Sequence, residues 1–193
     1  MKENWESTKS LHTLKANEIE EMFHSFMPDN KLISFQLLGN GLSNLNYKLH
    51  VEFCENPFIL RISDEKNCKF ENSLHCKLHT QLPVPKIYYS KYQDHHSYSV
   101  MEWKKGVHLK EIMYGKDVSA IRQSGFSVGY WLSKIRENKF INPGFFNENL
   151  EIIEPLKITP DTFIMIMKEF LIDGQTCHWL GKELTRKYGI LVI

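Results

Sequence analysis

In the stretch Leu37-Leu38-Gly39-Asn40-Gly41-Leu42-Ser43-Asn44-Leu45-Asn46-Tyr47, a polar turn punctuated by glycine separates two apolar runs. Residues 32–38 form the first run. The second run places Tyr47, Leu49, Val51 and Phe53 at two-residue spacing, which is the pattern of a half-buried strand. The sequence therefore predicts a strand–loop–strand hairpin. Such a loop can be a plain turn. Alternatively, its backbone N–H groups can bind phosphates, because glycine lets the backbone approach a ligand closely.

The next apolar strand, Pro57-Phe58-Ile59-Leu60-Arg61-Ile62, carries a cation inside it. A charge among apolar side chains is costly unless it is paired. Glu71 is the expected partner, since it begins a segment in which Phe70, Leu74 and Leu78 fall on one helical face. We therefore expect an Arg61–Glu71 ion pair. The alternatives are a snorkelling arginine and a solvated glutamate.

The chain then alternates between extended and helical patterns. Leu82-Pro83-Val84-Pro85 forces an extended break, and two short strands follow at 87–89 and 98–101. The second strand ends in Met101-Glu102-Trp103-Lys104-Lys105-Gly106. Beyond it, we expect a short helix at 109–113, a longer helix around 126–135, a connecting segment at 140–155, and helices near 160–173 and 175–188.

This order of elements resembles the N-terminal lobe of the kinase-like fold. It is most similar to the aminoglycoside phosphotransferase and choline kinase-like family of small-molecule kinases, and the similarity covers about residues 17–136. The matching pieces are Gly39-Asn40-Gly41-Leu42-Ser43-Asn44 with Tyr47, Phe58-Ile59-Leu60-Arg61, Glu71 with Leu74 and Leu78, Val84-Pro85, and Val100-Met101-Glu102 with Gly106.

The resemblance implies an α+β, protein-kinase-like fold. A five-stranded antiparallel N-terminal lobe would occupy residues 1–103, and an incomplete helical C-terminal lobe would occupy residues 104–193. It also implies an ATP-dependent phosphotransferase that acts on a hydroxyl of a small molecule. The cofactors in the complete family are ATP or GTP with Mg²⁺. The acceptor is not specified by the sequence.

The resemblance also implies roles for individual residues. The loop residues Gly39, Asn40, Gly41, Leu42, Ser43 and Asn44 would cover the nucleotide phosphates. Arg61 would contact the α- and β-phosphates, and Glu71 would hold it in place. The backbone of Met101, Glu102 and Trp103 would read the adenine edge.

The catalytic aspartate and the metal ligands of the family are not found in this sequence. The family carries them in a His-x-Asp loop and on a later strand. None of the nine histidines has aspartate two residues later. Leu171-Ile172-Asp173-Gly174 resembles a metal-binding strand end. However, the helical spacing of Phe163, Ile166, Met167 and Phe170 after Thr159-Pro160-Asp161 favours a helix end there.

We therefore assign no catalytic and no metal-binding residue, and we expect a fragment or degenerate copy of a phosphotransferase that is inactive by itself. A non-catalytic nucleotide-binding pseudo-kinase module and a remnant without a ligand are the alternatives. We also expect such a chain to be marginally stable and prone to association.

Composition narrows the possible partners and the compartment. The chain has 193 residues, 42% of them hydrophobic, and a net charge of +1, which favours neither nucleic acid nor an acidic membrane surface as a partner. Charges throughout the first thirty residues argue against a signal peptide or spanning segment, so we expect a cytoplasmic protein.

Two smaller patterns give further expectations. None of the four cysteines forms a CxxC pair. Glu71, His75 and His79 would share a helical face beside Cys76 and are conceivable metal ligands, but surface histidines are the favoured interpretation. A stripe of Ile19, Met22, Phe23 and Phe26 predicts an amphipathic helix, with Asn17 and Glu20 as a capping box.

Overall fold

The computed structural model describes residues 13–38, 44–92 and 97–170, together with residues 178, 181 and 183. The chain divides into two compact units, residues 1–139 with 146–151 and residues 140–145 with 152–193. The lobe boundary between residues 103 and 104 stays a prediction. Among the described residues, no helix is both long and apolar enough to cross a membrane.

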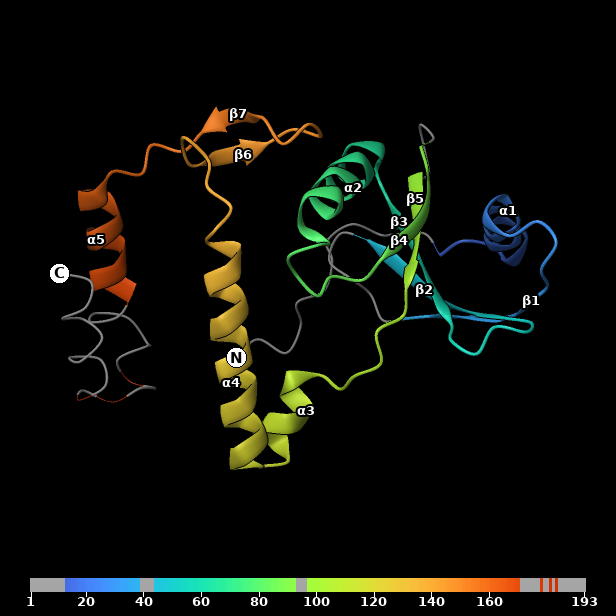
Figure 1. The fold of residues 1–193 in the computed structure, drawn as a ribbon, viewed down its shortest axis with the longest axis horizontal. Helices are drawn as coiled ribbons and strands as arrows, with labels where there is room; N and C mark the ends of the chain where they lie inside the picture. The colour runs from blue at the N-terminus through green and yellow to red at the C-terminus, as the bar shows by residue number, and fades with distance from the viewer. Residues whose placement is uncertain are drawn as a thin grey trace. The chain divides into compact units, whose positions relative to one another are not determined.

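The first unit is built on an antiparallel five-stranded sheet in the order β1-β2-β3-β5-β4 (Figure 1). The α+β class and the five-stranded antiparallel sheet expected from the sequence are therefore confirmed. The elements of this sheet and of its two flanking helices are α1 (Ala16–Phe26), β1 (Leu32–Leu37), β2 (Leu45–Val51), β3 (Phe58–Ser63), α2 (Glu65–Leu78), β4 (Ile87–Lys91) and β5 (Ser97–Glu102).

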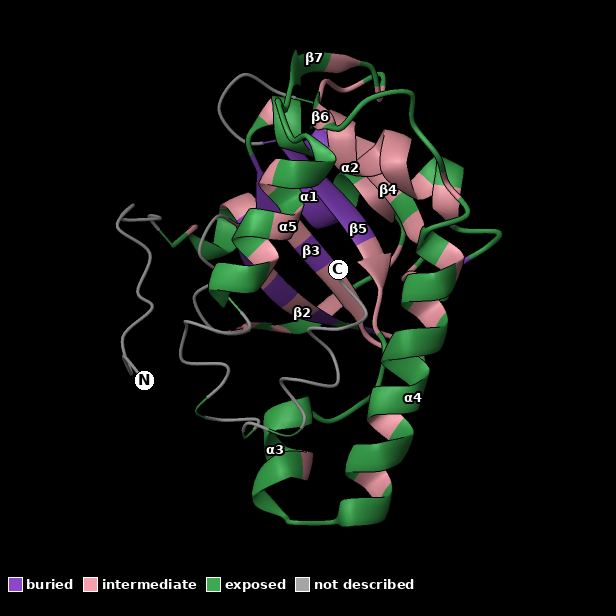
Figure 2. Ribbon diagram, turned by 90° about the vertical axis from the view of Figure 1, so that its left-hand side faces the viewer, coloured by how far each residue is buried: buried purple, intermediate pink, exposed green. Residues whose placement is uncertain are grey.

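The core lies on one face of the sheet, against α1. Cross-strand neighbours such as Leu60 and Val100 are fully buried there, as is Phe23 of α1. The backbone N–H of Leu14 donates to the hydroxyl of Tyr47 at 3.1 Å, which ties the start of α1 to β2. Figure 2 shows the buried residues concentrated on the strands. This packing follows from the alternation of apolar residues along the strands.

The opposite face of the sheet is more polar and carries α2, so the two helices flank the sheet on opposite sides (Figure 1). A single residue, Asp64, connects β3 to α2. Its carboxylate accepts a hydrogen bond from the N–H of Asn67 at 2.8 Å, which is a standard N-cap. This tight connection fixes where the first turns of α2 meet the sheet.

The helical region after β5 begins with α3 (Leu109–Tyr114), close to the range expected, and α4 (Val118–Ile135), which includes the expected helical residues but begins well before them. The segment expected to be a plain connection instead contains a two-stranded sheet of β6 (Gly144–Phe146) and β7 (Ile152–Pro155). In the second unit, α5 (Pro160–Lys168) begins as predicted, because the Thr159 hydroxyl accepts from the N–H of Thr162 at 3.1 Å. Residues 171–174 and most of the helix expected at 175–188 lie outside the described residues.

Two local predictions are wrong. Phe53 does not extend the β2 pattern: it lies in the turn after the strand with φ of 62° and is 96% exposed. The helix α1 starts earlier than expected, so Asn17 lies inside it and is not the N-cap. Instead, the carboxylate of Glu18 caps the first turn by accepting a hydrogen bond from the N–H of Lys15 at 2.7 Å. Periodicity alone does not show where a chain leaves a strand or enters a helix.

The burial of Phe23 gives a direct test of the core. We expect Phe23→Ala to lower the free energy of unfolding by about 3–5 kcal/mol, because it removes a fully buried ring and leaves a cavity. Phe53→Ala is the matched control, since that ring is almost fully exposed, and it should change stability by less than about 0.5 kcal/mol. Urea unfolding followed by circular dichroism measures both, and equal losses would contradict this assignment of the core.

An apolar stripe runs along one face of α4. At 100° per residue its members fall on one face of the helix, and they are between 37% and 67% exposed: Val118, Ile121, Val128, Leu132 and Ile135. Exposed apolar patches of this kind favour association.

We expect Leu132→Asp to reduce self-association, because it places a charge in the middle of this stripe. Gln123→Asp is the control, since Gln123 lies on a different face of α4 and is also exposed. Sedimentation velocity over a range of concentrations measures the effect. The same concentration dependence in both variants would show that the stripe does not drive association.

Candidate functional site

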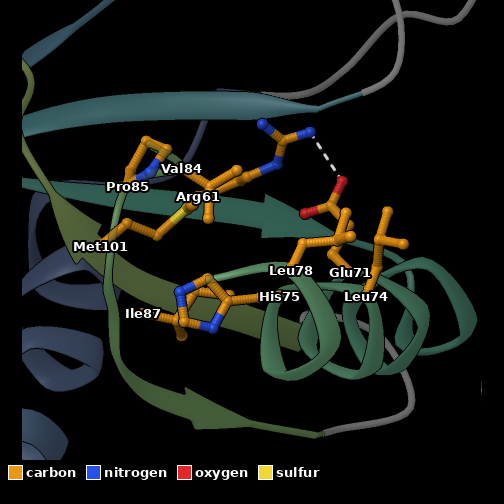
Figure 3. Close-up of a pocket in the computed structure, with 9 residues that line it drawn as sticks. All are labelled: Arg61, Glu71, Leu74, His75, Leu78, Val84, Pro85, Ile87 and Met101. Atoms are coloured by element: carbon orange, nitrogen blue, oxygen red, sulfur yellow. Dashed lines mark hydrogen bonds and ion pairs between the residues drawn. The ribbon is translucent and has the colours of Figure 1, made fainter. Parts of the chain in front are cut away.

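The ion pair expected between Arg61 and Glu71 is present. Nη2 of Arg61 lies 2.7 Å from Oε1 of Glu71, and the two side chains are 31% and 29% exposed (Figure 3). The amide Nδ2 of Asn44 lies 3.5 Å from the same carboxylate oxygen. The last residue of the glycine loop therefore reaches the pair. Residues Gly39 to Ser43 lie outside the described part of the chain.

The short β3–α2 connection explains how two residues so close in sequence meet. Arg61 lies two residues before the end of β3 and is paired across the sheet with Asn46 on one side and Ser99 on the other. Glu71 lies about two turns into α2, on the side of the helix that faces the sheet. The pair thus joins the helix to the central strand on the polar face of the sheet.

A pocket of about 190 Å³ opens beside the pair. Apolar side chains form most of its walls, and the charged pair forms one edge (Figure 3). The lining residues come from β3, α2, β5 and the segment that leads into β4: Arg61, Glu71, Leu74, His75, Leu78, Val84, Pro85, Ile87 and Met101. Sequence reasoning selected Leu74, Leu78 and Val84-Pro85 as family-like pieces but did not predict that they line one pocket.

A chain of polar side chains anchors α2 to the sheet behind the pair. The thiol of Cys68 lies 3.3 Å from the Ser99 hydroxyl, which lies 2.8 Å from the hydroxyl of Ser90. Ser90 donates to Oδ1 of Asn72 at 3.2 Å, and Nδ2 of Asn72 donates to the Tyr92 hydroxyl at 2.5 Å. These contacts bracket Glu71 along the helix. This polar face was not predicted, although the two-residue spacing of Ser97 and Ser99 in an apolar strand could have indicated it.

The segment Met101 to Trp103 forms the end of β5 and the chain beyond it. Met101 lines the pocket. The N–H of Glu102 donates to the carbonyl of Lys86 at 2.8 Å, so this N–H is already used within the sheet. Hydrogen bonds from Lys104 and from the N–H of Lys86 lower the pKa of the Glu102 carboxyl. The indole of Trp103 lies under Nζ of Lys48, 4.5 Å from the ring centroid. The N–H of Glu102 is therefore not free to read an adenine edge, and that role of the segment stays a prediction.

The histidines of α2 stack on each other along one face of the helix. The rings of His75 and His79 stack with centroids 5.2 Å apart, and Nδ1 of His79 lies 3.1 Å from the carbonyl of His75. Within the described ranges, no three potential metal ligands gather at one place. Nε2 of His75 is shielded from water. Burial, and then the neighbouring His79, lower the pKa of His75.

The comparison with solved structures defines the class of fold. The chain resembles the crystal structure of aminoglycoside phosphotransferase APH(4)-Ia with a TM-score of 0.54 and 16% sequence identity. The match covers 80% of this chain and 51% of that structure, so the chain spans about half its length. No family model and no curated protein sequence matches the chain. The similarity shows a kinase-like phosphotransferase fold, as expected from the order of elements.

The two thiols of α2 should react at very different rates. Cys68 is buried, and burial is the main cause that raises the pKa of its thiol, so little thiolate forms at neutral pH and the group is also inaccessible. Cys76 is exposed on the same helix. We expect iodoacetamide at pH 8 to label Cys76 readily and Cys68 only after unfolding.

Peptide mapping by mass spectrometry before and after addition of urea measures both rates in one sample. Labelling of folded Cys68 as fast as that of Cys76 would contradict the packing of α2 on the sheet.

Proposed function

We propose that the first unit is the nucleotide-binding part of a small-molecule kinase of the aminoglycoside phosphotransferase and choline kinase-like family. In this proposal the chain binds ATP or GTP, and the complete family transfers phosphate to a hydroxyl of a small molecule. The single observation that carries the proposal is the Arg61–Glu71 ion pair beside Asn44 on the polar face of a kinase-like sheet. This arrangement favours a nucleotide over a nucleic acid or a membrane surface as the partner.

The chemistry of the pair suits a phosphate chain. The arginine guanidinium is a planar fork with several N–H donors, so a carboxylate can hold the side chain while other N–H groups contact phosphate oxygens. Glu71 removes the cost of keeping this cation half-buried among apolar strand residues. Arg61 would neutralise the α- and β-phosphates, and residues 39–44 would cover them with backbone N–H groups.

We propose further that these 193 residues do not transfer phosphate by themselves. Transfer needs a carboxylate that accepts the hydroxyl proton, and no histidine of this chain has aspartate two residues later. Mg²⁺ accompanies the nucleotide in the family, and it neutralises phosphate charge there. The described residues offer no cluster of three ligands, so we assign no residue of this chain to a metal. A nucleotide-binding module that does not transfer phosphate by itself is therefore the form of the function that we propose.

Nucleotide binding tests the proposal directly. We expect isothermal titration calorimetry to detect ATP or GTP binding and Arg61→Ala to weaken it by at least about tenfold, because the cation facing the phosphates is lost. Arg122→Ala is the matched control, since this arginine lies on the exposed surface of α4. This variant should bind nucleotide with the same affinity as the natural chain. Equal affinities for Arg61→Ala and Arg122→Ala would contradict the proposed site.

A phosphate-transfer assay tests the second part of the proposal. The purified chain is incubated with ATP, Mg²⁺ and, in turn, aminoglycosides, choline, homoserine and sugar amines. We expect no acceptor-dependent consumption of ATP, since the loss of the proton acceptor costs several orders of magnitude in rate. Acceptor-dependent turnover that disappears in Arg61→Ala would show that another residue of this chain supplies the base.

A further inference from the structure

A second cavity lies on the side of α2 that faces away from the ion pair. At about 100° per residue, the helix residues that line it fall opposite to Glu71, Leu74 and Leu78. It measures about 680 Å³, which is within the range of about 300–1,000 Å³ for small-molecule sites. We call this cavity the α2 groove, and it shares no lining residue with the pocket beside the ion pair: Lys69, Asn72, Ser73, Cys76, Lys77, Tyr92, Glu148, Asn149 and Leu150.

A hydrogen-bonded turn between β6 and β7 forms one wall of the groove. Its residues 146–151 belong to the same compact unit as α2. Oδ1 of Asn147 accepts from the N–H of Asn149 at 3.0 Å and from the N–H of Glu151 at 2.9 Å. Leu150 has a φ of 61°, which is uncommon for a residue other than glycine, and its half-buried side chain lines the groove. The turn is therefore held in shape by its own contacts, and it presents a carboxylate, an amide and an apolar side chain to the groove.

The charges of the groove are separated along α2. Lys69 and Lys77 are eight residues apart, which is about 12 Å along the helix axis. The ammonium of Lys69 forms an ion pair with Glu65 and lies 5.5 Å from the ring centroid of Tyr92. The hydrogen bond to Glu65 is the main cause that raises the pKa of Lys69, and the charge of Glu148 adds to it. The Lys69 end thus has two carboxylates around one ammonium, whereas Lys77 supplies a positive charge at the other end.

A ligand with charge of only one sign would leave one end of the groove unmatched. We propose that the α2 groove binds a linear zwitterionic molecule of the size of a tripeptide, with its ammonium group at Glu148 and its carboxylate at Lys77. An extended tripeptide spans about 10 Å, and the flexible lysine side chain can cover the remaining distance. Leu150 packs against the middle of the ligand, and Ser73 and Asn149 can form hydrogen bonds with its peptide groups. No nucleotide takes part, so this proposal stands or fails separately from the proposed function.

The exposed thiol of Cys76 lies in the groove and reports whether the groove is occupied. We expect the peptide Ala-Leu-Ala with free ends, at millimolar concentration and pH 7, to slow the alkylation of Cys76 by iodoacetamide in a saturable manner. Alkylation of Cys54, which lies outside the groove, should not change. The same peptide acetylated at its N-terminus or amidated at its C-terminus should bind about three- to fivefold more weakly, the range of an exposed ion pair. The dipeptide Ala-Leu should also bind more weakly, because it is too short to reach both ends.

Two variants test the two ends of the groove separately. Glu148→Gln should bind the free and the acetylated peptide equally, and Lys77→Gln should bind the free and the amidated peptide equally, because each substitution removes the partner of one ligand end. Glu20→Gln on α1 and Lys66→Gln on α2 are matched controls at exposed positions outside the groove, and they should keep both preferences. Each comparison is made within one variant, so a change in folding affects both peptides alike. Protection of Cys76 that does not saturate, that is equal for all four peptides, or whose preferences persist in Glu148→Gln and Lys77→Gln would overturn the proposal.

Discussion

The Arg61–Glu71 ion pair is the interaction on which the candidate site of the first unit depends. It joins the central strand β3 to the helix α2 across a connection of a single residue, and a half-buried cation requires such a partner. Because Asp64 caps the helix directly after the strand, the position of Glu71 relative to Arg61 is set by the backbone. The polar contacts of Cys68 and Asn72 then hold α2 against β4 and β5 on either side of Glu71 along the helix.

The sheet has two faces of different chemistry, and each has its own role. The face towards α1 is a continuous apolar core that includes Leu60, Ile62 and Val100. On the other face, residues that alternate with these along the same strands, such as Arg61 and Ser99, meet α2. One face therefore forms the apolar core, and the other packs α2 and carries the candidate site. The pocket and the end of the glycine loop both lie on this polar face, beside the same ion pair.

Much of this arrangement could be predicted from the sequence because it depends on short-range patterns. Two-residue alternation located the strands, and a lone cation in an apolar strand identified Arg61 and its need for a carboxylate. The pocket could not be predicted in this way, since its lining joins residues from four segments that meet only in the folded chain. The β6–β7 sheet was missed because its strands have only three and four residues, too few for periodicity to show. Phe53 was wrongly predicted to extend β2 because the apolar alternation continues into the turn after the strand.

The central claim is that Arg61 and Glu71 act as one unit in nucleotide binding, and a double-mutant cycle on ATP affinity tests it most directly. Affinities are measured by calorimetry for the natural chain, Arg61→Ala, Glu71→Gln and the double variant. If Glu71 acts only by holding Arg61, the double variant binds ATP no more weakly than Arg61→Ala alone, so the two losses are not additive. Additive losses, or ATP binding that neither substitution changes, would contradict this account.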